Sequence, residues 1–437
     1  MLAAGAAAAS TAIILAGCSS AAPEAEAPEE GAELTLWISS SGAAEPIQEY
    51  MLDWAEEEGI ALDIEIHPQD QYQNTVQLAM TTGNAPDVFQ LSSPRNLMQA
   101  GYLLELEGLL SQELLDVYGS EFVENGPISI DGHLYGVPTT ANPVRLTYNK
   151  EIFEQAGLDP EAPPTTFDEL RDACEAISEL DGISCFGLPL AWVALTTWIL
   201  EPTISTTSDV LASPGLFDRE AGEFVFTEYT PVVELAREMI EKEWAFPGAS
   251  SLDGGPMLSA FGEGQIAMYI AGYQSSIVAD YPEAVENWGA ASVPVPDGAT
   301  SVRGTFNSGG PFGAFAGTEY PAAAAAVIEE LASNELAAEL VQAGLALPMR
   351  SDFDAGAITD ISDFTRSYWP TEADTQWPLS PAPDLEIQGE TYIQVIQRLI
   401  LGDEDIEGAL AEIQVKYQEA YDEAVADGDL DGEYFTG

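Results

Sequence analysis

The segment Leu34–Gly42, LTLWISSSG, opens the stretch of sequence that decides the fold. Its apolar first half has the composition of a buried strand, and its small polar second half has that of a loop. The residues that follow alternate between apolar runs of strand length and apolar residues at helical spacing. The predicted elements are strand Leu34–Ile38, helix Ala44–Glu57, strand Leu62–Ile66, helix Gln71–Thr81 and strand Asp87–Leu91. Strands that alternate with helices predict an α/β fold with a parallel or mixed sheet.

The stretch Asp131–Asn149 departs from this alternation. It holds two extended segments, Leu134–Val137 and Val144–Tyr148, with no helical pattern between them. Such a run of strand between two α/β regions is typical of a crossover between lobes. Further helices are expected over Lys150–Ala156, Phe167–Leu180, Pro231–Lys242, Tyr320–Ser333, Glu335–Ala343, Glu390–Leu401 and Ile406–Ala426. Further strands are expected over Gln265–Ala271 and Ala290–Val295 and on both sides of Gly309-Gly310.

The N-terminus has the features of an export signal. The uncharged apolar run Ala3–Ala16 is shorter than a helix that spans a bilayer. It ends in the lipobox-like Leu15-Ala16-Gly17-Cys18. We expect Cys18 to be acylated and to become the new N-terminal residue. The following Ser19–Ala32 contains only Ser, Ala, Pro, Glu and Gly, which predicts a flexible tether. The first basic residue is Arg95, which favours an internal start at Met1.

The charge balance excludes several classes of partner. The chain has 12 Lys+Arg against 74 Asp+Glu, a formal net charge of −62. Such a field repels polyphosphates, which argues against nucleic-acid binding. No Lys/Arg-rich helix is present to hold anionic lipid, so we expect membrane attachment through the acyl group alone. Two interpretations of the acidic surface stay open. The protein functions in saline or alkaline surroundings, or it is an ordinary acidic secreted protein.

The cysteines and histidines limit redox and metal chemistry. With Cys18 acylated, Cys174 and Cys185 are left outside the cytoplasm, and we favour a disulfide between them over free buried thiols. A count of only two histidines, His67 and His133, argues against a zinc site. The tail Asp427–Gly432 copies only the first half of an EF-hand loop, so no metal and no cofactor are expected.

Six short motifs carry a family resemblance. The chain resembles the carbohydrate-type extracellular solute-binding proteins, similar to the maltose-binding proteins of bacterial ABC importers. The motifs, in the family's order from about Leu34 to the C-terminus, are Gly83–Val88, Asp131–Pro138, Tyr148–Phe153, Pro164–Leu170, Phe261–Met268 and Val293–Gly298.

The resemblance implies a type II periplasmic-binding-protein-like fold. Two α/β lobes would be joined by crossover strands, with a ligand cleft between them that closes on binding. The implied division is a signal peptide at 1–18, a tether at 19–32, a first lobe at 33–141 with 302–350, and a second lobe at 142–301 with 351–437.

Polar residues at the ends of the first strands are the first candidate ligand contacts. Ser40 and Ser41 follow the first strand, and Gln90, Ser92 and Ser93 follow the third, at the carboxyl edge where open α/β sheets bind ligands. Serine equally serves as a helix N-cap, so for Ser40 and Ser41 both interpretations stay open. Asp87 is expected to orient its loop. Gly309 and Gly310 are expected to let backbone approach the ligand closely.

The resemblance adds further candidates. It implies a polar sugar contact at Asn142, an aromatic stacking position at Trp192 and contacts at Tyr273 and Gln274, where relatives often have Trp. Trp377 would cap the cleft or be pinned against prolines, and Arg350 would reach the cleft or hold a helix end. For Arg145, pairing with an acidic neighbour is the alternative to a ligand contact.

The expected function is binding without catalysis. The resemblance implies that the protein is the lipid-anchored substrate receptor of an ABC importer. We expect it to be a monomer on the extracellular side of the membrane, and its expected partners are a mono- or oligosaccharide and the permease subunits. A receptor of the same fold for a polyol or cationic solute is the alternative. A secreted glycosidase is disfavoured, because acid pairs arise by chance among 74 carboxylates and Gly-x-Ser-x-Gly is absent. An adhesion lipoprotein is the other class that stays open.

Overall fold

The computed structural model describes residues 28–29, 31–92, 94–130, 132–192, 195–205, 215–299, 304–358, 361–371, 374–377, 380–428, 430 and 432–435. The described residues do not include the segment 1–18 with Cys18, most of the expected tether, or Ser93. No helix in the described ranges is long and apolar enough to cross a membrane.

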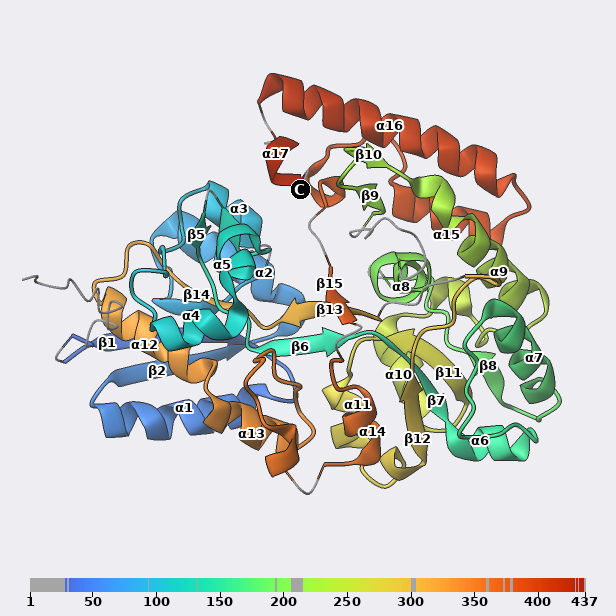
Figure 1. Ribbon diagram of the computed structural model, residues 1–437, viewed down its shortest axis with the longest axis horizontal. Coiled ribbons are helices and arrows are strands. Elements are labelled where there is room, and N and C mark those ends of the chain that lie inside the picture. Colours follow the sequence, from blue (N-terminus) through green and yellow to red (C-terminus); the bar gives the residue numbers. More distant parts are fainter. Residues whose placement is uncertain are drawn as a thin grey trace, which may run out of the picture.

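The first lobe is built on the sheet that the opening sequence predicts. Its four strands have the order β14-β3-β1-β2, with β1 parallel to both neighbours and β14 antiparallel to β3. The strands are β1 Glu33–Ser39, β2 Ala61–His67, β3 Val88–Gln90 and β14 Phe312–Ala314. Around this sheet lie helices α1 Ala44–Glu58, α2 Gln69–Thr82, α3 Pro94–Gln99, α4 Gln112–Tyr118, α5 Ser120–Asn125, α12 Pro321–Leu331 and α13 Asn334–Gln342, with hairpin β4 Ser129–Ile130 and β5 His133–Leu134 (Figure 1).

The second lobe has its own four-stranded sheet, of order β12-β7-β11-β8. The strands are β7 Arg145–Asn149, β8 Ser184–Phe186, β11 Ile266–Ala271 and β12 Trp288–Ala291. Its helices are α6 Lys150–Gln155, α7 Phe167–Ile177, α8 Glu201–Ser205, α9 Thr230–Glu241, α10 Gly254–Gly262, α11 Ser275–Asp280, α14 Asp363–Ser367, α15 Tyr392–Leu401, α16 Ile406–Asp427 and α17 Gly432–Phe435, with the small hairpin β9 Phe217–Asp218 and β10 Glu223–Phe224. A disulfide joins Cys174 of α7 to Cys185 of β8.

A small third sheet, of order β15-β13-β6, crosses between the lobes. Its strands are β6 Thr140–Pro143, β13 Gly304–Gly309 and β15 Asp374–Gln376, and β6 leads through Val144 directly into β7. Figure 1 shows β6 and β13 bridging the two halves of the molecule. The expected crossover is therefore confirmed.

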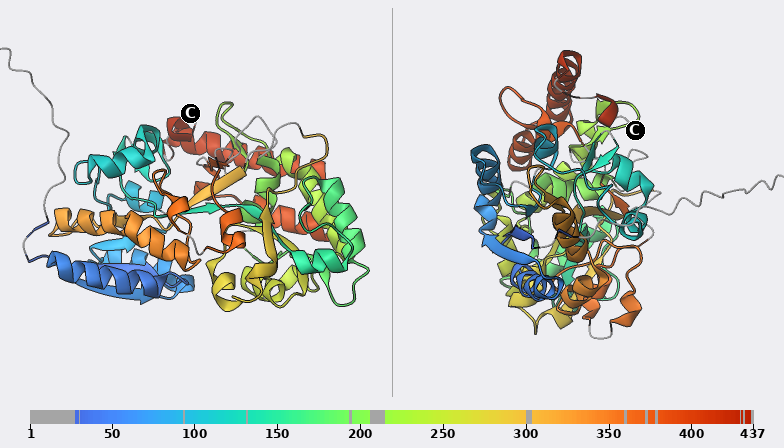
Figure 2. Two further views of the ribbon diagram at one scale, coloured as in Figure 1. Left: turned by 60° about the horizontal axis from the view of Figure 1, so that its bottom comes forward. Right: turned by 90° about the vertical axis from the view of Figure 1, so that its left-hand side faces the viewer.

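The hydrophobic residues form a separate large core in each half. One core draws on residues between 32 and 137 and between 312 and 346, and the other on residues between 144 and 293 and between 377 and 435. A smaller core combines residues between 252 and 288 with residues between 347 and 368. Figure 2 shows the two halves side by side. The expected two-lobed α/β architecture is confirmed, whereas the boundaries at 141, 301 and 350 stay a prediction.

The tether prediction needs a correction at its C-terminal end. Ala32 is only 1% exposed and belongs to the first core. The carboxylate of Glu29 accepts hydrogen bonds from the backbone N–H groups of Ala322 and Ala323, at 3.2 and 2.8 Å. Helix α12 has no side-chain cap of its own, so Glu29 supplies the acceptor and the negative charge that a helix N-terminus favours. The ordered body therefore includes Glu29.

Candidate functional site

Two parallel strands of the first lobe place polar groups at one edge of its sheet. Strands β1 and β3 end at Ser39 and Gln90, and the backbone N–H of Ser39 donates to Gln90 Oε1 at 3.1 Å. Helix α1 has Ala43 as its N-cap, without a side-chain hydrogen bond, so the N-cap interpretation of the serines is wrong for this helix. Ser40 Oγ instead accepts from the backbone N–H of Gln69, the first residue of α2. Ser41 lines the cavity beyond this edge.

A cavity of about 230 Å³ lies beyond this edge. Its lining includes six of the residues that sequence reasoning proposed, from both lobes and from the crossover sheet. These are Ser41, Gln90, Asn142, Tyr273, Gly309 and Gly310. The described lining contains no Asp, Glu, Lys, Arg or His. The site thus offers neutral hydrogen-bonding groups and no ion to pair with a charged ligand.

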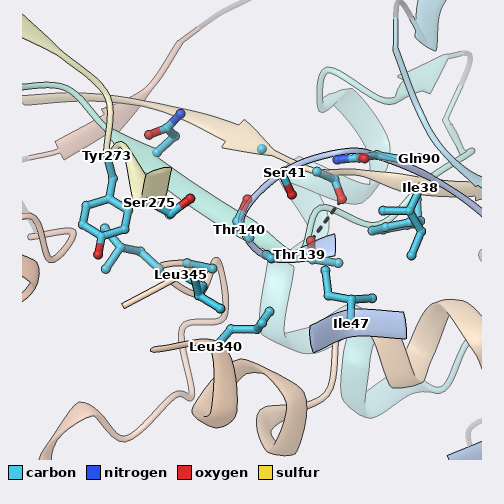
Figure 3. A pocket seen from close by; sticks show the side chains of 18 residues that line it. Ile38, Ser41, Ile47, Gln90, Thr139, Thr140, Tyr273, Ser275, Leu340 and Leu345 are labelled. Atoms are coloured by element: carbon cyan, nitrogen blue, oxygen red, sulfur yellow. Dashed lines mark hydrogen bonds between the residues drawn. The ribbon is translucent and has the colours of Figure 1, made fainter. Parts of the chain in front are cut away.

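The crossover strands bring polar groups to the lining of this cavity. Asn142 of β6 pairs with Asn307 of β13, and its Oδ1 is buried without a hydrogen-bond partner among the described residues. A buried acceptor in that state is costly unless a ligand or water satisfies it. The Thr139 hydroxyl donates to the Gly310 carbonyl at 3.0 Å (Figure 3).

The two glycines of this region are required by space and backbone geometry. A Cβ added to Gly309 would lie 2.7 Å from Thr140 Oγ1. Gly310 has φ +58°, and its added Cβ would lie 3.0 Å from Thr139 Oγ1. They let β13 approach β6 closely, so the expected close approach is between these two strands.

Tyr273 forms the wall contributed by the second lobe. Its hydroxyl donates to the Gly344 carbonyl at 2.6 Å and lies 3.1 Å from Thr365 Oγ1, which fixes the ring. Burial raises the pKa of the Tyr273 hydroxyl to about 12, so the group is neutral at physiological pH. Ser275, at the start of α11, stands beside it and lies across from Leu345 of the first lobe (Figure 3).

The other proposed residues that the structure describes lie outside this cavity. Trp192 packs against Gly254, where an added Cβ would meet the indole at 3.2 Å. The Gln274 amide donates to the Gly272 carbonyl, and the buried Ser92 Oγ has no partner among the described residues. Trp377 is 7% exposed and belongs to the second core.

Two residues have structural roles. Arg350 pairs with Asp352 and donates to the carbonyl of Ala332, the C-cap of α12, as in the helix-end interpretation. The expectation that Asp87 orients its loop is confirmed, since its carboxylate accepts from Thr35 and Thr318.

Sequence reasoning missed three polar lining residues, Thr139, Thr140 and Ser275, and all the aliphatic ones. Thr139 and Thr140 directly follow the quoted motif Asp131–Pro138, and that adjacency was the signal available for them. The aliphatic lining from Leu340 and Leu345–Leu347 carried no signal, because only the fold brings these residues to the sheet edge.

One cluster has ligand atoms suited to a metal. Single ligand atoms of Glu105, Glu107 and His133 lie within 4.8 Å of one another. His133 Nδ1 lies 2.5 Å from Glu107 Oε1, and Glu107 Oε2 accepts from the backbone N–H of Leu134 at 3.0 Å. These contacts give the cluster a structural role, because they hold β5 in place.

Comparison with known proteins agrees with this architecture. Residues 38–338 match the sequence model of the family described as bacterial extracellular solute-binding protein. A binding protein of Brucella abortus (strain 2308) is 26% identical over 261 residues, which are 58% of this chain and 59% of that protein. An arabinooligosaccharide-binding protein of Halalkalibacterium halodurans is 31% identical over 162 residues, 35% of each chain. The match thus spans about three fifths of the length of the first of these relatives.

A solved structure shares the fold of the whole molecule. The GacH receptor of Streptomyces glaucescens, determined unliganded and with acarbose, superposes with a TM-score of 0.72 at 18% sequence identity. The superposition covers 90% of this chain and 99% of that receptor. The fold is therefore the two-lobed type II periplasmic-binding-protein fold.

Proposed function

The chain belongs to the family of bacterial extracellular solute-binding proteins, and from that premise we propose that it is the sugar receptor of an ABC importer. The observation that carries the proposal is the cavity at the crossover strands, lined by neutral hydrogen-bonding groups from both lobes. A sugar presents hydroxyls and apolar C–H faces, which such a lining satisfies without ion pairing.

The size of the cavity favours a small ligand. Its volume of about 230 Å³ is below the roughly 300–1,000 Å³ of pockets for drug-sized molecules. A monosaccharide, or one ring of an oligosaccharide, suits that space best. A chain of several rings would extend outside it along the lobes.

The mechanism is binding coupled to closure of the lobes. Tyr273 and Ser275 come from the second lobe, whereas Ser41 and Gln90 come from the first, so one ligand would contact both. A ligand shifts an open–closed equilibrium only by its extra affinity for the closed form. The closed lobes would then present a joint surface to the permease, and no bond of the ligand would be broken.

We also propose that Cys18 anchors the protein by an acyl group on the outer side of the cell membrane, with the residues after it as a tether. The lipobox-like Leu15–Cys18 supports this attachment. Metabolic labelling with an alkyne fatty acid should mark the wild type, whereas Cys18→Ser should lose the label and be released into the medium. Equal labelling of the variant would contradict the anchor.

A thermal-shift screen of sugars, polyols and polyamines tests the binding function, followed by calorimetry on each compound that raises the melting temperature. At least one neutral sugar should bind with one-to-one stoichiometry and be recovered unchanged. Turnover of a bound oligosaccharide would instead support a glycosidase. If no sugar binds, the receptor proposal fails and the adhesion alternative gains.

One observation bears on the alternative of a cationic solute. A second groove, of about 590 Å³, lies between α3 and the α16 region and is lined by carboxylates of Glu386, Glu423 and Asp427, together with Asp384, which pairs with Arg95 at 2.9 Å. Its charge suits a polyamine, and for this reason the screen includes polyamines. Stabilisation by a polyamine and by no neutral compound would favour this alternative.

A further inference from the structure

Several large aliphatic side chains line the cavity. We call the set Ile47, Leu340, Leu345 and Leu347 the aliphatic wall. Figure 3 shows Leu340, Leu345 and Ile47 on one side, with Ser41, Thr140 and Gln90 on the other. A ligand held between these sides is in contact with hydrogen-bonding groups along one edge and with hydrocarbon along another.

Leu345 occupies the key position on this wall. It is half-buried, in the loop after α13, whereas Leu347 is 1% exposed and Leu340 is 6% exposed. A Cβ added to Gly42 would lie 3.6 Å from Leu345 Cδ2 and 3.5 Å from Ser275 Oγ. Leu345 and Ser275, from opposite lobes, thus flank the same small space. A ligand in contact with Ser275 therefore lies close to Leu345.

The apolar character of the aliphatic wall restricts which edge of a sugar can lie against it. A hydroxyl against leucine gives up its water hydrogen bonds and receives none in exchange. A methyl group in the same place buries apolar surface instead. A carboxylate or phosphate there is worse still, because the described lining carries no cation. The polar side of the cavity continues to satisfy the remaining hydroxyls.

Resting on the proposed function, we propose that the preferred ligand is an uncharged sugar with a deoxygenated edge, such as a 6-deoxyhexose, and that Leu345 determines this preference. The remaining hydroxyls face Ser41, Gln90, Thr140 and Asn142. The C6 methyl group lies against Leu345 and its neighbours.

Calorimetry with matched sugars tests this inference on the purified wild-type protein. Each set shares one stereochemistry and differs at C6, namely D-fucose, D-galactose and D-galacturonate, and D-quinovose, D-glucose and D-glucuronate, with L-rhamnose and L-mannose as a third pair. In the set that binds, the 6-deoxy sugar should bind about tenfold more tightly than its parent hexose, and the uronate should not bind. A parent hexose or uronate that binds as tightly as the deoxy sugar overturns the inference, and so does binding of sugars without a deoxygenated edge when none of the deoxy sugars binds.

A substitution in the wall locates the preference. Leu345→Asn keeps the side-chain size and adds hydrogen-bonding capacity, so the ratio of the two affinities should fall to about one. Leu78→Asn, at a leucine that is 64% exposed on α2, is the matched control and should keep the tenfold ratio. An unchanged ratio in Leu345→Asn overturns the role of Leu345, and the wild-type comparison holds even if this variant fails to fold.

The failure of this inference differs from the failure of the proposed function. Equal binding of deoxy and parent sugars removes the inference and leaves the sugar receptor intact. Absence of binding by every sugar, including the di- and trisaccharides of the thermal-shift screen, removes both.

Discussion

Arg145 and Asp374 form a two-point ion pair at the junction of the second lobe and the crossover sheet. Nη1 and Nη2 of Arg145 lie 2.8 and 2.7 Å from Oδ1 and Oδ2 of Asp374. The two side chains are 7% and 2% exposed. A Cβ on Gly304 would lie 1.7 Å from Asp374 Oδ1, so the pair also needs glycine there. It ties β7, the first strand of the second lobe, to β15 of the crossover sheet.

Asp374→Asn should destabilise the protein by about 3–5 kcal/mol, because it leaves the Arg145 charge buried without its counter-ion. Chemical denaturation measures this loss. The control is Glu161→Gln, which breaks the pair with Lys150 at a carboxylate that is 74% exposed and should cost no more than about 1 kcal/mol. Equal small losses in both variants would show that the buried pair does not hold the junction.

Glu201 predicts a specific pH dependence of stability. It is 1% exposed and accepts from Tyr229 Oη and the backbone N–H of Gly215, and burial raises its pKa to about 7 from 4.5. The raised value means that the folded state favours the protonated carboxyl. Its stabilising contribution is therefore complete below pH 4.5 and is lost as the pH rises through about 7.

Glu201→Gln should abolish this part of the pH dependence. Relative to the wild type, the variant should gain up to about 3 kcal/mol between pH 4.5 and pH 8, the free energy that corresponds to the pKa shift. Urea unfolding at several pH values gives the difference between the two proteins. The exposed carboxylate of Glu234 provides the control, since Glu234→Gln should follow the wild-type curve. A Glu201→Gln curve parallel to that of the wild type would refute the prediction.

Asn142 should contribute directly to ligand affinity. Because its buried Oδ1 has no partner among the described residues, a ligand hydroxyl can satisfy it. Asn142→Ala should weaken binding of the sugar found in the screen by about tenfold, the value of one hydrogen bond. Asn84→Ala, at an exposed position outside the cavity, should bind as the wild type does. Unchanged calorimetric affinity in Asn142→Ala would remove this residue from the site.

The net charge of −62 predicts a response to salt. Self-repulsion among 74 carboxylates is screened as ionic strength rises, so the melting temperature should increase with added NaCl. KCl at equal ionic strength should give the same increase. A melting temperature that falls or stays level in both salts would rule out self-repulsion as a significant cost.

The fold could be predicted from the sequence because the periodicity of its apolar residues is strong. The opening strand-helix alternation reappears as β1, α1, β2, α2 and β3, with bounds shifted by a few residues. Elements without clear periodicity were missed. Helix α10 begins with Gly254-Gly255-Pro256, a sequence that predicts a turn. The buried side chains of Met257 and Phe261 pack this helix against the second lobe. The expected strand Ala290–Val295 is shorter and begins earlier, as β12 Trp288–Ala291, where pairing with β7 ends.

The site could be predicted where polar residues follow a strand, where the family resemblance implies a contact, and where two adjacent glycines indicate a close approach. Ser41, Gln90 and Asn142 were found in that way and do line the cavity. Trp377 has the residue type expected at a sugar site, yet its ring is used in the second core. Leu345 has no such signal, because its role depends on a neighbour in the other lobe, Ser275, that only the tertiary structure supplies.

Small-angle X-ray scattering, with and without the sugar that stabilises the protein most, tests the central claim most directly. If a ligand at Tyr273 and Ser275 draws the second lobe onto Ser41 and Gln90, the radius of gyration should fall on addition of the sugar. At the same sugar concentration below saturation, it should fall much less for Asn142→Ala, whose affinity is about tenfold weaker. Scattering curves that superpose with and without every stabilising sugar would contradict closure around a bound ligand.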